Sequence, residues 1–184
     1  NGLTVVAVDG FRLALRREPL ERIEGGAFSF VAPGAALNEV EKICEDIDSF
    51  ATITLGQRHI LFEMGETELI CRRLEGDFLD YKNAIPRRNP ISVTVDTKAM
   101  LESLDRVSVV ISEKLKSPVC RIDGDGQGLE IGFNNRYLMD ALRFAPADEL
   151  KLELNTGISP AILVPTDGEE SFLYMVLPVR LKAQ

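Results

Sequence analysis

The sequence predicts an α+β fold in which antiparallel strands form sheets and helices cover one face of a sheet. Three observations support this prediction. Short apolar stretches, alternating or continuous and separated by turn residues, are typical of strands. Only a few segments repeat apolar residues at the helical period. The order of a strand, a helix and then several strands occurs twice along the chain.

The first part of the chain predicts one helix among several strands. Strands are expected at residues 3–8, 27–31, 51–55, 58–64 and 67–73. Turn pairs such as Asp9-Gly10 separate them, because glycine supplies the positive φ that a tight turn needs. Apolar residues from Ala36 to Ile47 recur at the helical period, with mostly acidic residues on the other side. This pattern indicates an amphipathic helix that lies on a sheet.

A break in periodicity divides the chain. Residues 76–89 hold glycine, proline and charges over a stretch too long for a hairpin turn, and we interpret them as an interdomain linker. The linker separates a domain at residues 1–75 from a domain at residues 90–184. Beyond it, "ISVTVD" (residues 91–96) predicts a strand, followed by a helix that Asp96 or Thr97 would cap.

The last part of the chain predicts a further helix and a strand meander. "LEIGF" (residues 129–133) predicts a strand, and "NNRYLMDALRF" (residues 134–144) predicts a helix with Tyr137 facing inward and Asp140 facing outward. The chain then closes with three predicted strands, at residues 150–154, 159–165 and 171–178. Short turns join these strands, which is typical of an antiparallel meander.

Composition and charge exclude several classes of protein. The 184 residues are 45% hydrophobic, which is enough for one core of ordinary size or two small ones. A net charge of −8 argues against a general attraction to nucleic acid or anionic membranes. No apolar run approaches a membrane span and no signal segment opens the chain, so we expect a cytoplasmic protein. Because residue 1 is Asn, we expect a fragment or a processed product.

No residue pattern predicts catalysis or metal binding. His59, the single histidine, lies in a strand pattern with no nucleophile motif nearby. "DGDGQG" (residues 123–128) starts like a calcium loop, but its twelfth position is Asn134, where a bidentate Glu is required. A glycine-rich turn is the favoured interpretation. The three cysteines, Cys44, Cys71 and Cys120, lack metal-ligand spacing and are expected to be reduced and buried.

We therefore predict no catalytic residue, no metal and no cofactor. An enzyme that used carboxylates as acid and base would need acids that converge in a pocket. The sequence scatters its acids over helix faces and turns. What remains is a binding surface, and a protein-interaction domain is one class that fits.

Four segments carry a resemblance to a known family. They are "VAVDGFRLALRRE" (residues 6–18), "GDFLDYKNAIP" (76–86), "LEIGFNNRYLMDAL" (129–142) and "FLYMVLPVRL" (172–181). Together, and in this order, they resemble the bacterial DNA sliding clamp, the beta subunit of DNA polymerase III. The resemblance covers essentially the whole chain, as the later part of the second clamp domain, the linker and the third domain.

The resemblance implies the DNA-clamp fold and a non-enzymatic processivity factor. Each clamp subunit has three similar domains, and a homodimer closes a ring around duplex DNA, with helices lining the hole and sheets outside. Implied partners are DNA polymerase III, other proteins that dock short linear motifs, and the clamp loader. The first domain is absent from this sequence, so ring closure by this chain alone is doubtful. A protein-interaction domain without a DNA role is the alternative.

The resemblance also implies a peptide-binding groove between the second and third domains. Its matching positions are Val8, Gly10, Phe11, Arg12, Leu13, Leu79, Ala84, Pro160, Met175, Val176, Leu177, Pro178, Val179 and Arg180. Apolar walls from Val176, Leu177 and Val179 suit apolar peptide side chains, and Met175 can adapt its shape to different ligands. Pro178 stops the last strand from pairing onward.

The chain departs from the family pattern at several positions. Phe11 stands where a histidine is common, and Leu79 where a proline is common. Val119 and Cys120 adjoin where the family has a further pair of strands. The helix expected to line the hole lacks basic residues at its start and carries an acidic face. The candidates for contact with DNA are Arg106, Lys114, Lys116, Arg136 and Arg143.

Overall fold

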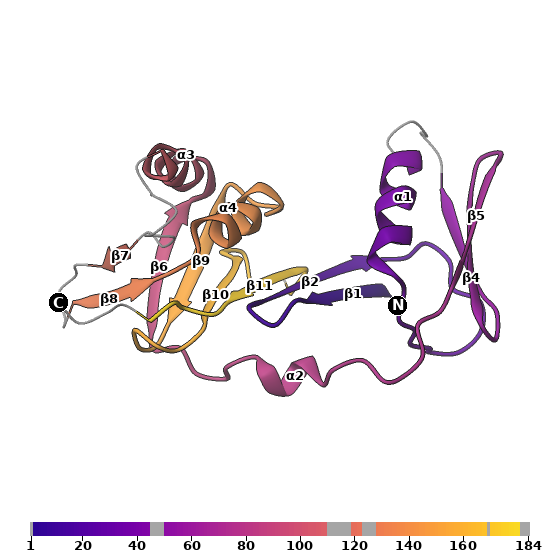
Figure 1. Cartoon of the computed structure of the whole chain (residues 1–184), viewed down its shortest axis with the longest axis horizontal. Helices are drawn as coiled ribbons and strands as arrows, with labels where there is room; N and C mark the ends of the chain where they lie inside the picture. The colour runs from indigo at the N-terminus through magenta and orange to yellow at the C-terminus, as the bar shows by residue number, and fades with distance from the viewer. Residues whose placement is uncertain (1, 45–49, 110–118, 123–127, 169, 181–184) are drawn as a thin grey trace. The chain divides into compact units, whose positions relative to one another are not determined.

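Two compact units make up the chain (Figure 1). The structure, a computed structural model, describes residues 2–44, 50–109, 119–122 (backbone only), 128–168 and 170–180. The large unit combines residues 1–23 with residues 83–184, and the small unit comprises residues 24–82. None of the helices in these described ranges is long and apolar enough to cross a membrane.

A six-stranded antiparallel sheet forms the large unit, in the order β1-β2-β11-β10-β9-β6. Its strands are β1 (Gly2–Val8), β2 (Arg12–Pro19), β6 (Ile91–Asp96), β9 (Glu149–Leu154), β10 (Ala161–Pro165) and β11 (Phe172–Val176). Because β2 pairs with β11, the N-terminal hairpin extends a sheet whose other strands come from the second half of the chain. The first and last strands of the chain are thereby brought close together.

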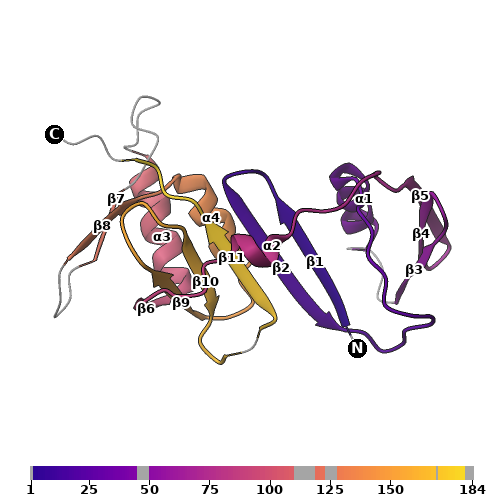
Figure 2. The same ribbon diagram turned by 90° about the horizontal axis from the view of Figure 1, so that it is seen from below.

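Two helices cover one face of this sheet (Figures 1 and 2). They are α3 (Thr97–Ser108) and α4 (Asn135–Arg143). The side chain of Asp96 caps α3 by accepting the N–H of Ala99 at 2.6 Å, and Asn134 caps α4 by accepting the N–H of Arg136 at 3.0 Å. The segment that leads from α2 (Tyr81–Ala84) to β6 runs along the opposite face of the sheet.

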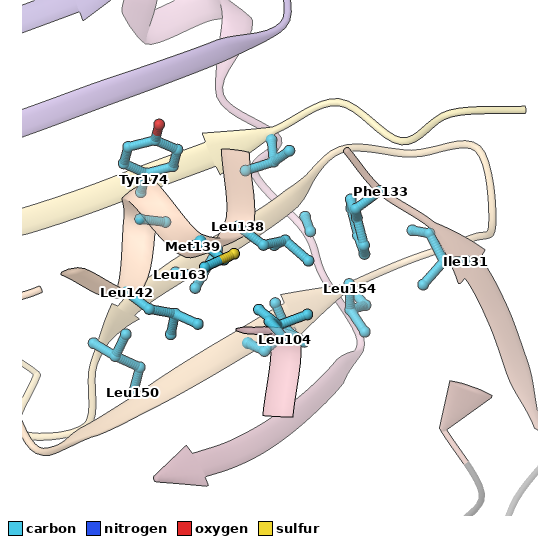
Figure 3. Packing of buried hydrophobic residues seen from close by; sticks show 14 of the residues in the cluster. Leu104, Ile131, Phe133, Leu138, Met139, Leu142, Leu150, Leu154, Leu163 and Tyr174 are labelled. Atoms are coloured by element: carbon cyan, nitrogen blue, oxygen red, sulfur yellow. The ribbon is translucent and has the colours of Figure 1, made fainter. Parts of the chain in front are cut away.

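The core of the large unit lies between the helices and the sheet (Figure 3). Leu138 and Leu142 of α4 and Leu104 of α3 pack against alternate residues of the strands. In β9 these residues are Leu150, Leu152 and Leu154, and in β11 they are Phe172, Tyr174 and Val176. The period-two alternation of the strands and the apolar stripe of each helix meet in this layer. It positions α4 directly beside β11.

A short hairpin of β7 (Val119–Ile122) and β8 (Leu129–Gly132) completes the large unit. Gly132 forms a bridge with Val179, so the end of the described chain pairs with β8. The junction of Val119 and Cys120 lies inside β7, in the pairing with β8. The predicted turn at residues 123–128 lies outside the described residues except for Gly128.

The small unit packs one helix on a three-stranded antiparallel sheet. Its elements are α1 (Gly34–Cys44), β3 (Ala51–Leu55), β4 (His59–Met64) and β5 (Thr67–Arg72), with β4 in the centre. Ile60, Phe62 and Met64 of β4 are buried, and Val40 and Ile43 of α1 pack against them. The predicted amphipathic helix on a sheet is confirmed as far as Cys44. Its predicted continuation to Ile47 lies outside the described residues.

Most strand and helix predictions are confirmed, and the exceptions are instructive. Residues 27–31 form no strand, and their one ladder contact in the described chain is the bridge between Val31 and Leu74. The apolar alternation of "AFSFV" is therefore not sufficient, because the segment has no neighbouring strand over most of its length. β2 and β7 were not expected as strands. In β2 the apolar alternation covers only Leu13 and Leu15 before charged residues follow.

Candidate functional site

The predicted groove residues of the large unit, apart from Ala84 on α2, gather at one end of the sheet. Arg12, at the start of β2, pairs with Val176 at the end of β11, and Val176 pairs with Ala161 at the start of β10. Pro160 directly precedes β10. Residues from both ends of the chain and from the β9–β10 turn thus meet at this end. The sheet register alone produces this arrangement.

A tight turn connects β1 to β2 at the same end, and we call residues 9–12 the hairpin tip. Gly10 has φ +86°, the left-handed conformation that glycine adopts most readily. Asp9 Oδ1 accepts the backbone N–H groups of Phe11 and Arg12, both at 3.1 Å. Asp9 and Gly10 therefore fix the turn, as their residue types predict.

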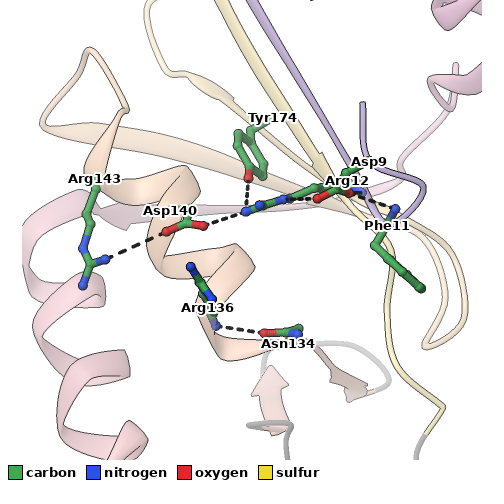
Figure 4. A network of polar contacts seen from close by, with 8 residues as sticks. All are labelled: Asp9, Phe11, Arg12, Asn134, Arg136, Asp140, Arg143 and Tyr174. Carbon is green, nitrogen blue, oxygen red and sulfur yellow. Dashed lines mark hydrogen bonds and ion pairs between the residues drawn. The ribbon is translucent and has the colours of Figure 1, made fainter. Parts of the chain in front are cut away.

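Arg12 connects the hairpin tip to two other elements (Figure 4). Its Nε donates to Asp9 Oδ2 at 2.7 Å, and its Nη1 donates to Asp140 Oδ2 on α4 at 2.6 Å. Nη1 also lies 3.2 Å from the Tyr174 hydroxyl on β11. The guanidinium carbon stands 4.4 Å from the centre of the Tyr137 ring. We call these five residues, Asp9, Arg12, Tyr137, Asp140 and Tyr174, the Arg12 network.

Charge pairing sets the protonation of the Arg12 network. Burial by itself raises the pKa of the Asp9 carboxyl, but the bonds from Arg12 and from the Phe11 N–H outweigh it, so this pKa lies below its ordinary value. Burial by itself lowers the pKa of Arg12, but the hydrogen bonds to Asp9 and Asp140 outweigh this effect. The pKa therefore lies above its ordinary value, and Arg12 stays charged. Burial raises the pKa of the Tyr174 hydroxyl. At neutral pH Arg12 is therefore a cation beside the Asp9 carboxylate, and Asp140 Oδ2 accepts a hydrogen bond from its Nη1.

Phe11 presents an exposed aromatic surface beside this network. Its ring stacks on Tyr137, with 6.3 Å between the ring centres, and 60% of the residue remains exposed. Such a stacked pair contributes on the order of 0.5–1.5 kcal/mol beyond the burial of area. Tyr137 thus contacts both Phe11 and Arg12. The hairpin tip is held on α4 by an aromatic contact and an ion pair.

The chain after β11 crosses this end of the sheet, and we call residues 177–180 the C-terminal segment. The N–H of Leu177 donates to the carbonyl of Phe11 at 2.8 Å, and the N–H of Val179 donates to the carbonyl of Gly132 at 2.8 Å. Pro178 lies between them and has no N–H to donate. The segment is therefore tied to the hairpin tip on one side and to β8 on the other. The side chains of residues 177–179 are partly exposed.

The predicted groove residues differ in exposure. Leu13 and Val176 are fully buried and Met175 is 7% exposed. Partly exposed residues are Arg12, Pro160, Leu177, Pro178 and Val179, and exposed ones are Val8, Gly10, Phe11, Ala84 and Arg180. Leu13 and Met175 pair in register and point to the face opposite Val176, which packs in the core against α4. The buried members therefore support a surface that the exposed members form.

Leu79 is the one predicted groove residue of the small unit. It is 56% exposed and belongs to the small unit, whereas the other predicted groove residues belong to the large unit. Its carbonyl accepts the N–H of Tyr81 at 2.7 Å, at the start of α2.

Four members of the Arg12 network were missed as site residues by the sequence reasoning: Asp9, Tyr137, Asp140 and Tyr174. Tyr137 was predicted to face inward and Asp140 to face outward. Asp140 lies outside the apolar core, but its side chain is only 24% exposed because it pairs with Arg12. The signal for Tyr137 and Asp140 was their i, i+3 spacing, which places both on one side of α4. Nothing in the sequence pairs them with Arg12.

The basic residues predicted to face DNA lie on the helices where they are described. Arg106 on α3 approaches Glu102 at 3.9 Å and Ser103 at 2.9 Å. Arg143 on α4 approaches Asp140 at 3.9 Å, and Arg136 on α4 is exposed. Lys114 and Lys116 lie outside the described residues. On the predicted hole-lining helix α1, Lys42 pairs with Glu39 at 2.7 Å.

Two family models match successive parts of the chain. The model of the DNA polymerase III beta subunit, central domain, matches residues 1–80. The model of the DNA polymerase III beta subunit, C-terminal domain, matches residues 119–180. Both belong to the same protein, and they match in the order that the sequence resemblance predicts.

Relatives and solved structures agree with these matches. A beta sliding clamp from Synechocystis is 31% identical over 219 aligned residues, covering 98% of this chain and 56% of the relative. A DNA polymerase III beta subunit from Eubacterium rectale has a TM-score of 0.88 at 26% identity, covering 100% of this chain and 55% of that one. A sliding clamp from Bartonella birtlesii, solved bound to griselimycin, has a TM-score of 0.87 at 27% identity, covering 98% of this chain and 55% of that one.

These comparisons confirm the predicted fold class, an α+β DNA-clamp fold of antiparallel sheets with helices on one face. The chain spans about half the length of the curated relatives it matches. The alignment with the Synechocystis relative is longer than the chain itself, so that relative carries segments that this chain lacks.

Proposed function

We propose that this chain, which belongs to the DNA polymerase III beta subunit family, is part of a DNA sliding clamp whose own activity is the docking of short peptides. The division we propose is a partial second clamp domain at residues 1–75, a linker at 76–89 and a third domain at 90–184. The proposed role is a processivity factor and not an enzyme. Its proposed place of action is the cytoplasm.

One observation carries the peptide-docking proposal: the hairpin tip and the C-terminal segment lie side by side. The sequence reasoning placed both in one groove, and the hydrogen bond from Leu177 to Phe11 joins them directly. Around this bond, Phe11, Leu177, Pro178 and Val179 offer apolar surface that is not fully buried. An apolar surface fixed by backbone bonds suits a short extended peptide with apolar anchors.

The expected affinity follows from the size of such anchors. Each apolar side chain that is fully buried gains roughly 1.5–3 kcal/mol. Two anchors, reduced by the entropy lost when a flexible peptide is ordered, give moderate affinity and rapid exchange. This fits a surface that serves several proteins in turn. The proposed partners are DNA polymerase III and other proteins with short linear motifs, together with the clamp loader.

We propose that the intact protein forms a homodimeric ring that contacts duplex DNA. This contact does not depend on the base sequence of the DNA. The candidates are Arg106, Lys114, Lys116, Arg136 and Arg143. Of the described ones, Arg106 and Arg143 lie near carboxylates, which reduces their attraction for phosphate. With the net charge of −8, this predicts weak and strongly salt-dependent binding of DNA by the chain alone.

A fluorescence-anisotropy titration tests peptide docking. The probe is a labelled peptide that contains a glutamine and a leucine-phenylalanine pair, titrated with the full 184-residue chain. We expect saturable binding, and we expect Leu177→Asp to abolish it because a carboxylate would have to be desolvated beside the ligand. Val109→Asp is the matched control, since Val109 is 84% exposed at the C-cap of α3, outside the proposed groove. Equal loss in both variants, or no binding by the folded wild-type chain, would count against peptide docking.

A further inference from the structure

The positive charge of Arg12 is already paired within the chain, so Arg12 is poorly suited to pair with a charged group of a ligand. Its Nε and Nη1 atoms are bonded to Asp9 and Asp140 at 2.7 and 2.6 Å, and Nη1 also meets the Tyr174 hydroxyl. One face of the guanidinium covers the Tyr137 ring at 4.4 Å. Two carboxylates therefore balance one cation before any peptide arrives. This arrangement is typical of a residue that holds structure in place.

The elements that Arg12 connects are those that shape the proposed groove. Asp140 belongs to α4, which is anchored in the core by Leu138 and Leu142. Arg12 belongs to the hairpin tip, where Phe11 is 60% exposed and has its ring against Tyr137. The ion pair is 24–28% exposed at its two side chains, so water screens it less than a surface pair. The ion pair thereby ties the hairpin tip to a helix that is anchored in the core.

The hairpin tip in turn holds the C-terminal segment. The carbonyl of Phe11 accepts the N–H of Leu177, and Phe11 directly precedes Arg12 in the chain. The second tie of the segment, from Val179 to Gly132, does not involve the hairpin tip. A displacement of Arg12 should therefore loosen Leu177 and leave Val179 in place.

We propose that Asp140, acting through Arg12, is a positioning residue for the peptide groove: the pair fixes the hairpin tip on α4 and so holds Phe11 and Leu177 in the arrangement that a ligand meets. This inference rests on the proposed function for its ligand. It assigns a role to α4 and predicts that removing the Asp140 carboxylate weakens peptide binding although Asp140 forms no part of the apolar surface.

The first arm of the test needs no peptide. Amide hydrogen exchange of the full chain, followed by NMR, compares wild type with Asp140→Asn, which keeps the shape of the side chain and removes its charge. We expect exchange at the Leu177 amide to become about tenfold faster and exchange at the Val179 amide to stay unchanged. Unchanged exchange at Leu177 would overturn the proposal.

The second arm measures affinity for the same labelled peptide. Asp140→Asn is expected to weaken binding about five- to tenfold, and the substitution should have much less effect when Arg12→Met is already present, because coupled residues are not additive. Asp140→Glu, which keeps a carboxylate on a longer side chain, should recover part of the loss. Faster exchange at Leu177 with unchanged affinity would also overturn the proposal, since the pair would then hold the turn without shaping the groove.

A matched control and a second variant protect the interpretation. Glu170→Gln removes an ion pair with Arg17 at the other end of β2, where Glu170 is 84% exposed, and it should alter neither readout. If Asp140→Asn fails to fold, Arg12→Lys replaces it, because lysine keeps the charge but cannot bond to both carboxylates in the same planar geometry. Absence of binding by wild type would contradict the proposed function, and the exchange measurement would still decide whether the pair holds Leu177.

Discussion

The N–H of Leu177 donates to the carbonyl of Phe11 at 2.8 Å, which joins the end of the described chain to its first hairpin. The bond continues the pairing of β11 with β2 by one further contact, past the last ladder pair of Val176 and Arg12. It sets where the C-terminal segment leaves the sheet. The apolar end of the sequence is therefore both a final core strand, up to Val176, and a surface segment beyond it.

Gly10 should be the most sensitive position of the hairpin tip to a small substitution. A Cβ at Gly10 would meet no atom within 4 Å, so its cost arises from the backbone alone at φ +86°. We expect Gly10→Ala to lower the free energy of unfolding by roughly 1–2 kcal/mol, measured by chemical denaturation. Gly26→Ala is the control, because Gly26 also has open space and its φ is not positive. A similar cost at both positions would show that the conformation of Gly10 is not responsible.

The lowered pKa of Asp9 predicts a pH dependence of stability. A carboxyl whose pKa is lower in the folded state contributes stability above its unfolded pKa, near 3.8, and loses it as the pH falls through the folded value. Wild type should therefore be more stable than Asp9→Asn at neutral pH. The difference should shrink when the pH falls below 3.8. Denaturation of both proteins across this range measures the difference, and a gap that does not change with pH would refute the charge-based explanation.

The core between α4 and the sheet predicts a large effect at Leu138. This side chain is fully buried among residues of α4 and the sheet strands, so Leu138→Ala removes buried area and leaves a cavity. The expected loss is about 2–5 kcal/mol in the free energy of unfolding. Ile158→Ala serves as the control because Ile158 is 78% exposed, and it should change stability by no more than about 0.5 kcal/mol. A small loss at Leu138 would mean that the layer repacks.

The elements that the sequence predicts well are those whose signal is local. The cap Asp96, the apolar stripe of α4 and the alternation of "LKLEL" in β9 each lie within a few residues, and each forms as expected. The turn at Asp9-Gly10 was predicted on the same grounds. Local patterns of this kind depend on backbone preference and on the alternation of side chains, which the sequence carries directly.

The features that were missed depend on partners far away in the chain. β2 is a strand because β1 and β11 flank it, and charged residues after Leu15 hide its alternation. Residues 27–31 alternate well but have almost no strand to pair with. Asp140 looks like a solvent-facing helix residue until the fold brings Arg12 to it. The groove positions came from the family resemblance, and their role in binding stays a prediction.

Mapping a peptide onto the structure by NMR tests the central claim most directly. The full isotope-labelled chain would be titrated with the glutamine and leucine-phenylalanine peptide while backbone amide signals are followed. The account predicts shifts that saturate and that cluster at Phe11, Arg12, Leu177 and Val179, with little change in β3, β4 and β5. Shifts confined to the small unit, or none at high peptide concentration, would contradict the proposed docking surface.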